Sequence, residues 1–176
     1  MNKSYFWAGV VAVVMMMECL VGCADKETEQ ATTSMGNPWV ETDKSGVMEA
    51  TSFEMNVPTD AENVVYSYLD IEPKMGQVTY DLAGNQWTYR MQKATELTDI
   101  SGMYYEWDVQ GEDQVSGCDA MWYAYSEPGE NTDYIDDMWA VHVINWYDNS
   151  TQTVYSLSVS GNDVNGLDIK VFAEEL

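Results

Sequence analysis

Basic residues are scarce in this chain of 176 residues, which contains 7 Lys and Arg against 30 Asp and Glu, a formal net charge of −23 at pH 7. Nucleic-acid binding requires Lys and Arg clustered against the phosphates, so the composition excludes nucleic acid as a partner. An anionic bilayer or wall polymer would also repel the chain within a Debye length of about 8 Å. The acidic excess favours a soluble domain on a crowded cell surface over an acidic recognition surface.

Cysteine and histidine are also sparse, with three Cys and one His in the chain. Cys19 and Cys23 lie near the N-terminus, so Cys118 alone is left for the body of the protein and no internal disulfide is expected. A zinc site needs three or four suitably spaced ligands, whereas the single His142 lies in an apolar segment that is typical of a core histidine. We therefore assign no metal and no cofactor. Calcium is the alternative left open by two oxygen-rich stretches, 130–137 and 163–168, although neither has the spacing of an EF-hand loop.

Signatures of catalysis are missing as well. The chain has no Gly-x-Ser-x-Gly elbow, and no local motif supports a thiolate–imidazole pair of Cys118 and His142. Adjacent acids such as Asp136 and Asp137 arise by chance in a chain this acidic, and glycoside hydrolysis needs two acids at a defined separation in a cleft. We therefore predict that the protein is not an enzyme, and a small hydrolase is the third of three functional alternatives.

The chain has one long hydrophobic run, residues 5–17. Its length of about thirteen residues is typical of a signal peptide, whereas a transmembrane helix needs about 20. The run follows Lys3 and leads to Leu-Val-Gly-Cys at 20–23, which resembles the lipobox cut by lipoprotein signal peptidase. That resemblance implies a diacylglycerol on Cys23, the first residue of the mature chain. Two acyl chains anchor a protein stably, so we expect a lipoprotein on the cell membrane that faces outside.

What the chain does contain falls into three segments. Residues 1–22 are the expected lipoprotein signal peptide, and residues 23–36 are small, polar and charged, which predicts a disordered tether. Residues 37–176 are long enough to form one domain with its own core. Alternating or Val- and Tyr-rich stretches between turn signals predict strands. The expected strands are residues 52–57, 63–71, 77–82, 86–92, 103–109, 118–126, 139–147 and 153–159.

Hairpin connections between these strands predict an antiparallel sheet. The polar stretches 111–117 and 127–137 are expected to form a turn and an exposed loop, and residues 40–50 a short helix or turn. Apolar residues at i, i+3, i+4 and i+7 from Ile169 indicate a C-terminal helix with an N-cap at 162–163. The predicted fold is α+β, a single domain with an antiparallel sheet of about seven strands and the C-terminal helix packed on one face. A β-sandwich is the alternative.

Trp and Tyr are plentiful, with 7 Trp and 12 Tyr against 3 Phe. They must supply core bulk, but they also permit a glycan-binding module, which would present two or more coplanar exposed rings on one sheet face. The stretch 100–107 contains the candidate binding residues Tyr104, Tyr105 and Trp107, and Arg90 is a fourth candidate. The alternatives are a tight turn leading into a core strand and, for Arg90, an ion pair with a strand carboxylate.

Six blocks in a fixed order carry a family resemblance. They are Asn-Pro-Trp at 37–39, Phe-Glu-Met-Asn-Val-Pro at 53–58, Thr-Tyr-Arg at 88–90, Asp-Ile-Ser-Gly-Met-Tyr-Tyr-Glu-Trp at 99–107, Trp-Tyr at 146–147 and Tyr-Ser-Leu-Ser at 155–158. Over residues 37–176 the chain resembles uncharacterised extracytoplasmic lipoproteins of Clostridia and other Firmicutes, and a domain of unknown function in some of their anti-sigma-like proteins. The resemblance implies a Gram-positive host and transfers no catalytic residue.

The sequence thus predicts a membrane-anchored bacterial surface lipoprotein with a ligand- or partner-binding or sensing domain. Its expected partners are membrane lipid, through Cys23, and an unknown protein or glycan ligand. A glycan-binding module is the second alternative.

Overall fold

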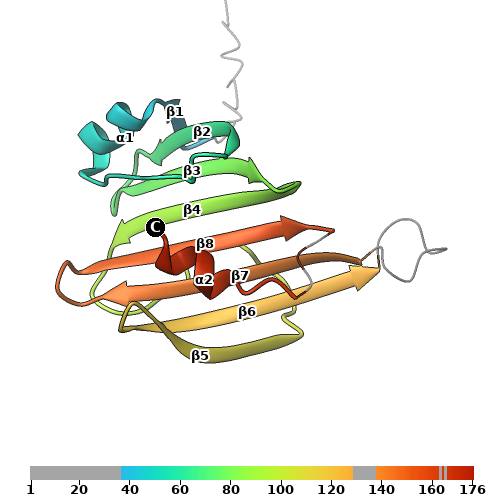
Figure 1. Cartoon of the computed structure of the whole chain (residues 1–176). Helices are drawn as coiled ribbons and strands as arrows, with labels where there is room; N and C mark the ends of the chain where they lie inside the picture. Colours follow the sequence, from blue (N-terminus) through green and yellow to red (C-terminus); the bar gives the residue numbers. More distant parts are fainter. Residues whose placement is uncertain (1–36, 129–137, 163, 165) are drawn as a thin grey trace, which may run out of the picture. The chain divides into compact units, whose positions relative to one another are not determined.

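The fold is built on one antiparallel sheet (Figure 1). The computed structural model describes residues 37–128, 138–162, 164 and 166–176, and within them eight strands pair in the order β1-β2-β3-β4-β8-β7-β6-β5. The expected antiparallel sheet and C-terminal helix are confirmed, with eight strands in place of about seven. The elements are β1 (Trp39–Thr42), α1 (Lys44–Thr51), β2 (Glu62–Leu69), β3 (Met75–Leu82), β4 (Asn85–Lys93), β5 (Val109–Val115), β6 (Cys118–Pro128), β7 (Met138–Asp148), β8 (Thr153–Gly161) and α2 (Ile169–Glu174).

The largest correction concerns β5. A strand at 103–109 and a turn at 111–117 are both wrong, because the strand runs over Val109–Val115 and the turn is confined to Ser116 and Gly117. Both turn residues have positive φ, as a two-residue hairpin requires. β5 lies at the edge of the sheet and leaves most of its side chains exposed. It therefore lacks the apolar alternation that marks a half-buried strand.

Smaller corrections concern the segments around the helices. Residues 52–57 are not a strand but an irregular segment whose Phe53 and Met55 are buried in the core. The expected short helix is α1, capped by Asp43, whose Oδ1 accepts from the Gly46 N–H at 2.8 Å. The N-cap of α2 is Asp168 rather than a residue at 162–163. The expected signal peptide, tether and oxygen-rich stretch 130–137 lie outside the described residues, as does most of the expected loop at 127–137.

Side chains alternate along the strands and give the sheet two faces, and we call the one that carries both helices the helix face. Its central cross-strand row consists of Val78, Tyr89, Leu157 and Ile144, all of them buried. Trp87 is 1% exposed, stacks on Tyr80 with 6.3 Å between the ring centroids, and meets Phe172 of α2 at 4.7 Å. Each fully buried aliphatic side chain contributes about 1.5–3 kcal/mol, so this face supplies most of the core.

The opposite side is the crossing face, named after the crossing segment, residues 94–108, which connects β4 to β5. Its central cross-strand row consists of Gln77, Arg90, Ser156 and Asn145. The crossing segment is held at both ends: the Tyr147 hydroxyl donates to the Ala94 carbonyl at 3.3 Å, and the Asp108 N–H donates to the Ala124 carbonyl at 3.0 Å. Between these points Ile100 packs into a second, smaller apolar cluster.

β7 is covered on both sides, as its unbroken apolar sequence predicts. Val141 and Val143 on the crossing face and Ala140 on the helix face are fully buried.

In Figure 1, α2 lies over β7 and β8, and α1 lies beside β2 and β3. Among the residues that the structure describes, no helix combines the length and apolarity that crossing a bilayer requires.

Candidate functional site

The four candidate binding residues all belong to the crossing face. Tyr104, Tyr105 and Trp107 lie in the crossing segment, and Arg90 projects from β4 beneath it. Tyr104 is 97% exposed, whereas Tyr105 and Trp107 are half-buried. The structure therefore brings Tyr105 and Trp107 into one packed group and leaves Tyr104 in solvent. Arg90 lies between the sheet and the crossing segment.

Arg90 holds the crossing segment onto the sheet. Its Nε donates to Gln77 Oε1 at 2.7 Å, and its Nη1 donates to the carbonyls of Ile100, at 3.1 Å, and Ser101. The guanidinium lies over the Trp39 ring at 5.3 Å, a cation–π distance. Burial lowers the Arg90 pKa, and the nearby Asp99 opposes that shift. None of the ion pairs within the described residues involves Arg90, so its contacts are with carbonyls instead of a strand carboxylate.

Gly102 shows how closely the crossing segment approaches Arg90. Its φ is +68°, a conformation that L side chains rarely adopt, and a Cβ there would lie 2.4 Å from Arg90 Nη1. Two further contacts fix the same stretch: the Ser101 N–H donates to Asp99 Oδ1 at 2.8 Å, and Asn145 Nδ2 donates to that oxygen at 3.2 Å. The segment that carries Tyr104 and Tyr105 is thus positioned by polar contacts at its base.

Beyond Gly102 the crossing segment enters an aromatic cluster, defined as Tyr105, Trp107, Tyr123, Tyr125 and Trp139. Tyr105 is central: its ring stacks on Tyr125 at 4.9 Å and meets Trp107 at 5.5 Å and Trp139 at 6.1 Å. Trp107 also contacts Tyr123 at 5.4 Å with 34° between the rings. The hydrogen bond to Glu127 raises the Tyr125 pKa. These rings cover one another or are tilted, so the cluster is not a flat platform of coplanar exposed rings.

At one end of this cluster is a pocket of about 740 Å³, called here the Trp139 pocket. Its floor is the cross-strand row Asp81, Gln86 and Ser160, contributed by β3, β4 and β8 on the crossing face. Its remaining lining consists of Asp60, Glu62, Leu82, Ala83, Gly84 and Trp139. Trp139 both lines the pocket and contacts Tyr105, so the pocket and the aromatic cluster form one continuous surface.

The Trp139 pocket is acidic. Among the residues that the structure describes, three carboxylates line it, at Asp60, Glu62 and Asp81, and no Lys, Arg or His does. Asp81 is oriented by Asn63, whose Nδ2 donates to Oδ2 at 2.7 Å. Carboxylate, amide and hydroxyl groups beside an indole ring can accept and donate hydrogen bonds while the ring packs on an apolar or cationic surface. Such a pocket suits an uncharged or cationic ligand and repels an anionic one.

Sequence reasoning did not identify this pocket. The turn signal at 84–85 places Asp81 and Gln86 on either side of one hairpin, so these two residues could have been brought together from the sequence. Ser160 and Trp139 could not, because they join the pocket only through the pairing of β8 with β4 and β7.

The remaining reactive side chains lie on the helix face, where Cys118 and His142 are not paired. His142 opposes Ala124 on β6, six positions along that strand from Cys118, a separation on the order of 20 Å. Burial raises the Cys118 pKa, with Asp148 and Asp119 adding to the shift, so the thiol is not activated. Among the described residues, no group of three or more His, Cys, Asp or Glu is arranged to hold a metal ion.

Comparison of the chain with protein-family models, with curated proteins and with solved structures gave no match. Any inference about function therefore rests on the residues and pockets described above.

Proposed function

We propose that this protein is a lipid-anchored, non-enzymatic surface protein whose folded domain binds an extracellular ligand in the Trp139 pocket. The observation that carries the proposal is the convergence of an indole ring, three carboxylates, an amide and a hydroxyl on one cavity. The volume lies within the range of ligand sites, about 300–1,000 Å³, although the lining is more polar than that of most such sites. Two contacts support the pocket from its surroundings: Asn63 Nδ2 donates to Asp81, and the Trp139 ring packs on Tyr105.

The ligand that fits this pocket best is uncharged or cationic, because the described part of the lining is acidic and contains no basic residue. A direct test is thermal-shift and calorimetric titration of residues 37–176 with short Lys-containing peptides and with neutral oligosaccharides. Trp139→Ala should weaken binding of the active probe by about tenfold or more, as expected when a central aromatic anchor is removed. Trp107→Ala is the matched control, because Trp107 belongs to the aromatic cluster but does not line the pocket. Equal losses in both variants would contradict the pocket assignment.

A neutral glycan is the second candidate ligand, favoured by the side chains beside Trp139. A sugar ring can stack on the indole while Asp81, Gln86 and Ser160 accept or donate hydrogen bonds to its hydroxyls. Asp81→Asn separates the two ligand classes, because it removes a charge but keeps a hydrogen-bonding side chain. Binding of a basic peptide should weaken in this variant, whereas binding of a neutral oligosaccharide should be largely retained. A glycan array without hits would exclude the second candidate.

The anchor is proposed from the lipobox-like motif at 20–23. Replacing Cys23 with Ala should abolish metabolic labelling with a fatty-acid analogue and release the protein from the membrane fraction, because the thioether carries the two acyl chains. Cys118→Ala is the matched control and should leave labelling unchanged. Labelling that persists in the Cys23 variant would contradict lipid attachment at this position.

We further propose that the chain belongs with the extracytoplasmic lipoproteins of Gram-positive Firmicutes that it resembles. In this assignment the fold is an α+β domain over residues 37–176 with α2 packed on the sheet, and a β-sandwich is the alternative classification. These assignments are supported by the order of the resembling sequence blocks and by the β-rich architecture with a C-terminal helix.

A further inference from the structure

A second cavity lies on the opposite side of the sheet, and we call it the α2 pocket. It has a volume of about 320 Å³, is open to solvent and lies between β5, β6 and β7 and the turn that leads into α2. Its floor includes Trp122, Ala124 and Ile144, and Leu167 and Ile169 form its wall on the α2 side. The volume is at the lower end of the range of ligand pockets, about 300–1,000 Å³. A molecule with one or two rings therefore matches it.

The shape of the floor is set by Gly111. Trp122 is half-buried, and its indole lies against the backbone of β5 at Gly111, where a Cβ would come within 2.7 Å of Nε1. The floor thus offers an aromatic surface beside aliphatic side chains, an environment that favours a planar aromatic molecule.

Among the described residues, His142, the single histidine of the chain, brings a polar side chain to the floor. His142 is half-buried between Ala124 and the turn that contains Leu167. Burial lowers its pKa, and a hydrogen bond with the Leu167 backbone acts in the opposite direction. The imidazole is therefore neutral at pH 7 and provides a hydrogen-bonding group without a charge.

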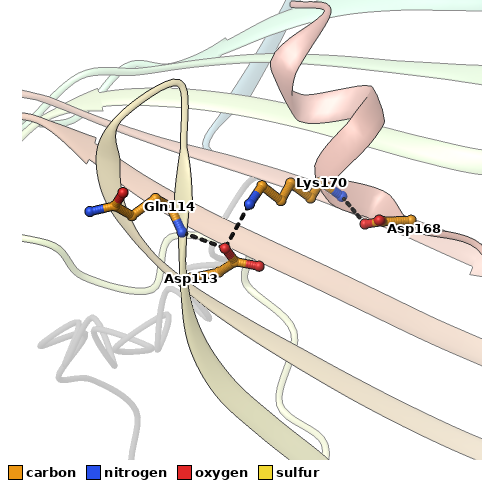
Figure 2. A network of polar contacts seen from close by, with 4 residues as sticks. All are labelled: Asp113, Gln114, Asp168 and Lys170. Atoms are coloured by element: carbon orange, nitrogen blue, oxygen red, sulfur yellow. Dashed lines mark hydrogen bonds and ion pairs between the residues drawn. The ribbon is translucent and has the colours of Figure 1, made fainter.

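The rim of the α2 pocket has an acidic balance (Figure 2). Lys170 Nζ lies 2.7 Å from Asp113 Oδ1 and joins α2 to β5 across the opening, while the Lys170 backbone N–H donates to Asp168 Oδ1 at 3.1 Å. The Gln114 N–H also donates to the Asp113 carboxylate, at 2.7 Å. Within the described lining, Lys170 is the one cation, and it is already paired with Asp113 while the Asp168 carboxylate lies beside it. An anionic ligand would meet net negative charge.

We infer that the α2 pocket is a binding site for a small, uncharged, planar aromatic molecule such as a phenol or an indole, which packs on Trp122 and Ile144 and hydrogen-bonds to His142. This site is separate from the Trp139 pocket, because the two lie on opposite faces of the sheet. The ion pair of Lys170 and Asp113 holds the α2 side of the site in place.

The test uses indole as the probe and the His142 imidazole as the reporter, because a chain with one histidine gives a single imidazole Cε1–H signal in proton–carbon-13 NMR spectra. Indole should shift that signal saturably and give intermolecular NOEs to the rings of His142 and Trp122. Indole-3-acetate should bind about fivefold more weakly, because its carboxylate meets the acidic rim. An absent or non-saturable response to indole would overturn the inference, and equal affinity for both probes would overturn the charge argument.

Two variants narrow the site from opposite sides. Ala124→Leu fills the floor and Leu167→Phe fills the wall, and each should abolish the saturable shift. The second variant lies outside the sheet, so it tests the site even if the first disturbs folding. Trp139→Ala is the control and should bind indole as the unmodified chain does. Indole binding that survives both filling variants, or that is lost in Trp139→Ala, would place the site elsewhere. If no ligand were found for the Trp139 pocket, the indole experiment would still test the α2 pocket. The two proposals can therefore be refuted independently.

Discussion

The two faces of the sheet are stabilised in different ways although the same strands build both. The helix face is closed by interlocking apolar side chains, with Trp87 almost completely buried between Tyr80 and Phe172. The crossing face is closed by an irregular segment that polar contacts of Arg90 and Asn145 hold in place. Apolar packing is non-directional, whereas hydrogen bonds fix orientation. The comparison indicates that the helix face supplies most of the stability. In the function that we propose, the crossing face positions the side chains that bind the ligand.

The largest expected effect comes from opening the helix face. Trp87→Ala should lower the free energy of unfolding by about 3–5 kcal/mol, because a fully buried indole is replaced by a cavity. Tyr104→Ala on the crossing face should change it by less than about 0.5 kcal/mol, because that side chain is 97% exposed. Urea denaturation followed by far-UV circular dichroism measures both. Similar losses in the two variants would contradict the division between the faces.

Removing the central contact of the crossing face should have an intermediate effect. Arg90→Ala leaves the carbonyls of Ile100 and Ser101 without their charged donor and should cost about 1.5–3 kcal/mol. Hydrogen exchange should rise in residues 99–107 while the strands of the helix face stay protected. Arg90→Lys should recover only part of the loss, because an ammonium group lacks the planar fork of the guanidinium.

The control for Arg90 is Lys44→Ala, which removes an exposed ion pair with Glu54 and should cost at most about 1 kcal/mol. If Arg90→Ala accelerated exchange throughout the sheet, the crossing segment would be part of the main cooperative unit rather than a separately held element.

Ser156 provides a smaller and opposite test on the crossing face. Its Oγ is buried and has no hydrogen-bond partner within the described residues. Ser156→Ala should therefore leave stability unchanged or raise it by up to about 1 kcal/mol, because a desolvated hydroxyl is removed. Ser158→Ala is the matched control. The Ser158 hydroxyl donates to the Thr88 carbonyl at 3.5 Å, so its removal should lower the free energy of unfolding slightly. A clear loss of stability in the Ser156 variant would mean that its hydroxyl is bonded in solution.

The smallest expected effect is a pH dependence on the helix face. Burial lowers the His142 pKa below its ordinary value of 6.5, so the unfolded chain takes up this proton at higher pH than the folded chain does. The free energy of unfolding should therefore fall as the pH drops below 6.5. His142→Gln should flatten this slope between about pH 6.5 and pH 5 in urea titrations. The hydrogen-bonded carboxylates of Asp113 and Asp148, with pKa values below 3.8, contribute only in stronger acid.

Local signals predicted the parts of the fold that depend on neighbours in the sequence. The turn at 84–85, the apolar run of β7 and the helical spacing after Ile169 gave β3–β4, β7 and α2 close to their observed bounds. A strand was predicted over residues 103–109, at the end of the crossing segment, where Met103, Tyr105 and Trp107 alternate as strand residues do. In the structure these three side chains are half-buried and the residues between them are exposed. Among the described residues, no strand pairs with this stretch.

The candidate site divides in the same way. Tyr105 and Trp107 were candidates from the sequence, and both belong to the aromatic cluster beside the Trp139 pocket. Trp139 and Ser160, which line the pocket, were not candidates. They come together only because β8 is inserted between β4 and β7. Arg90 was a candidate because basic residues are scarce in this chain. Its role as a support for the crossing segment depends on contacts with carbonyls, which no composition signal encodes.

The position of β8 also sets the order in which the domain can be completed. It is the last strand in the chain, yet it lies in the middle of the sheet and joins β1–β4 to β5–β7. The two halves cannot close into one sheet until residues 153–161 have been synthesised. Folding that depends on such long-range strand pairing is slow. If the protein is exported as we propose, the sheet would therefore stay incomplete until almost the whole chain has been synthesised, and an unfolded chain can pass through a secretion channel.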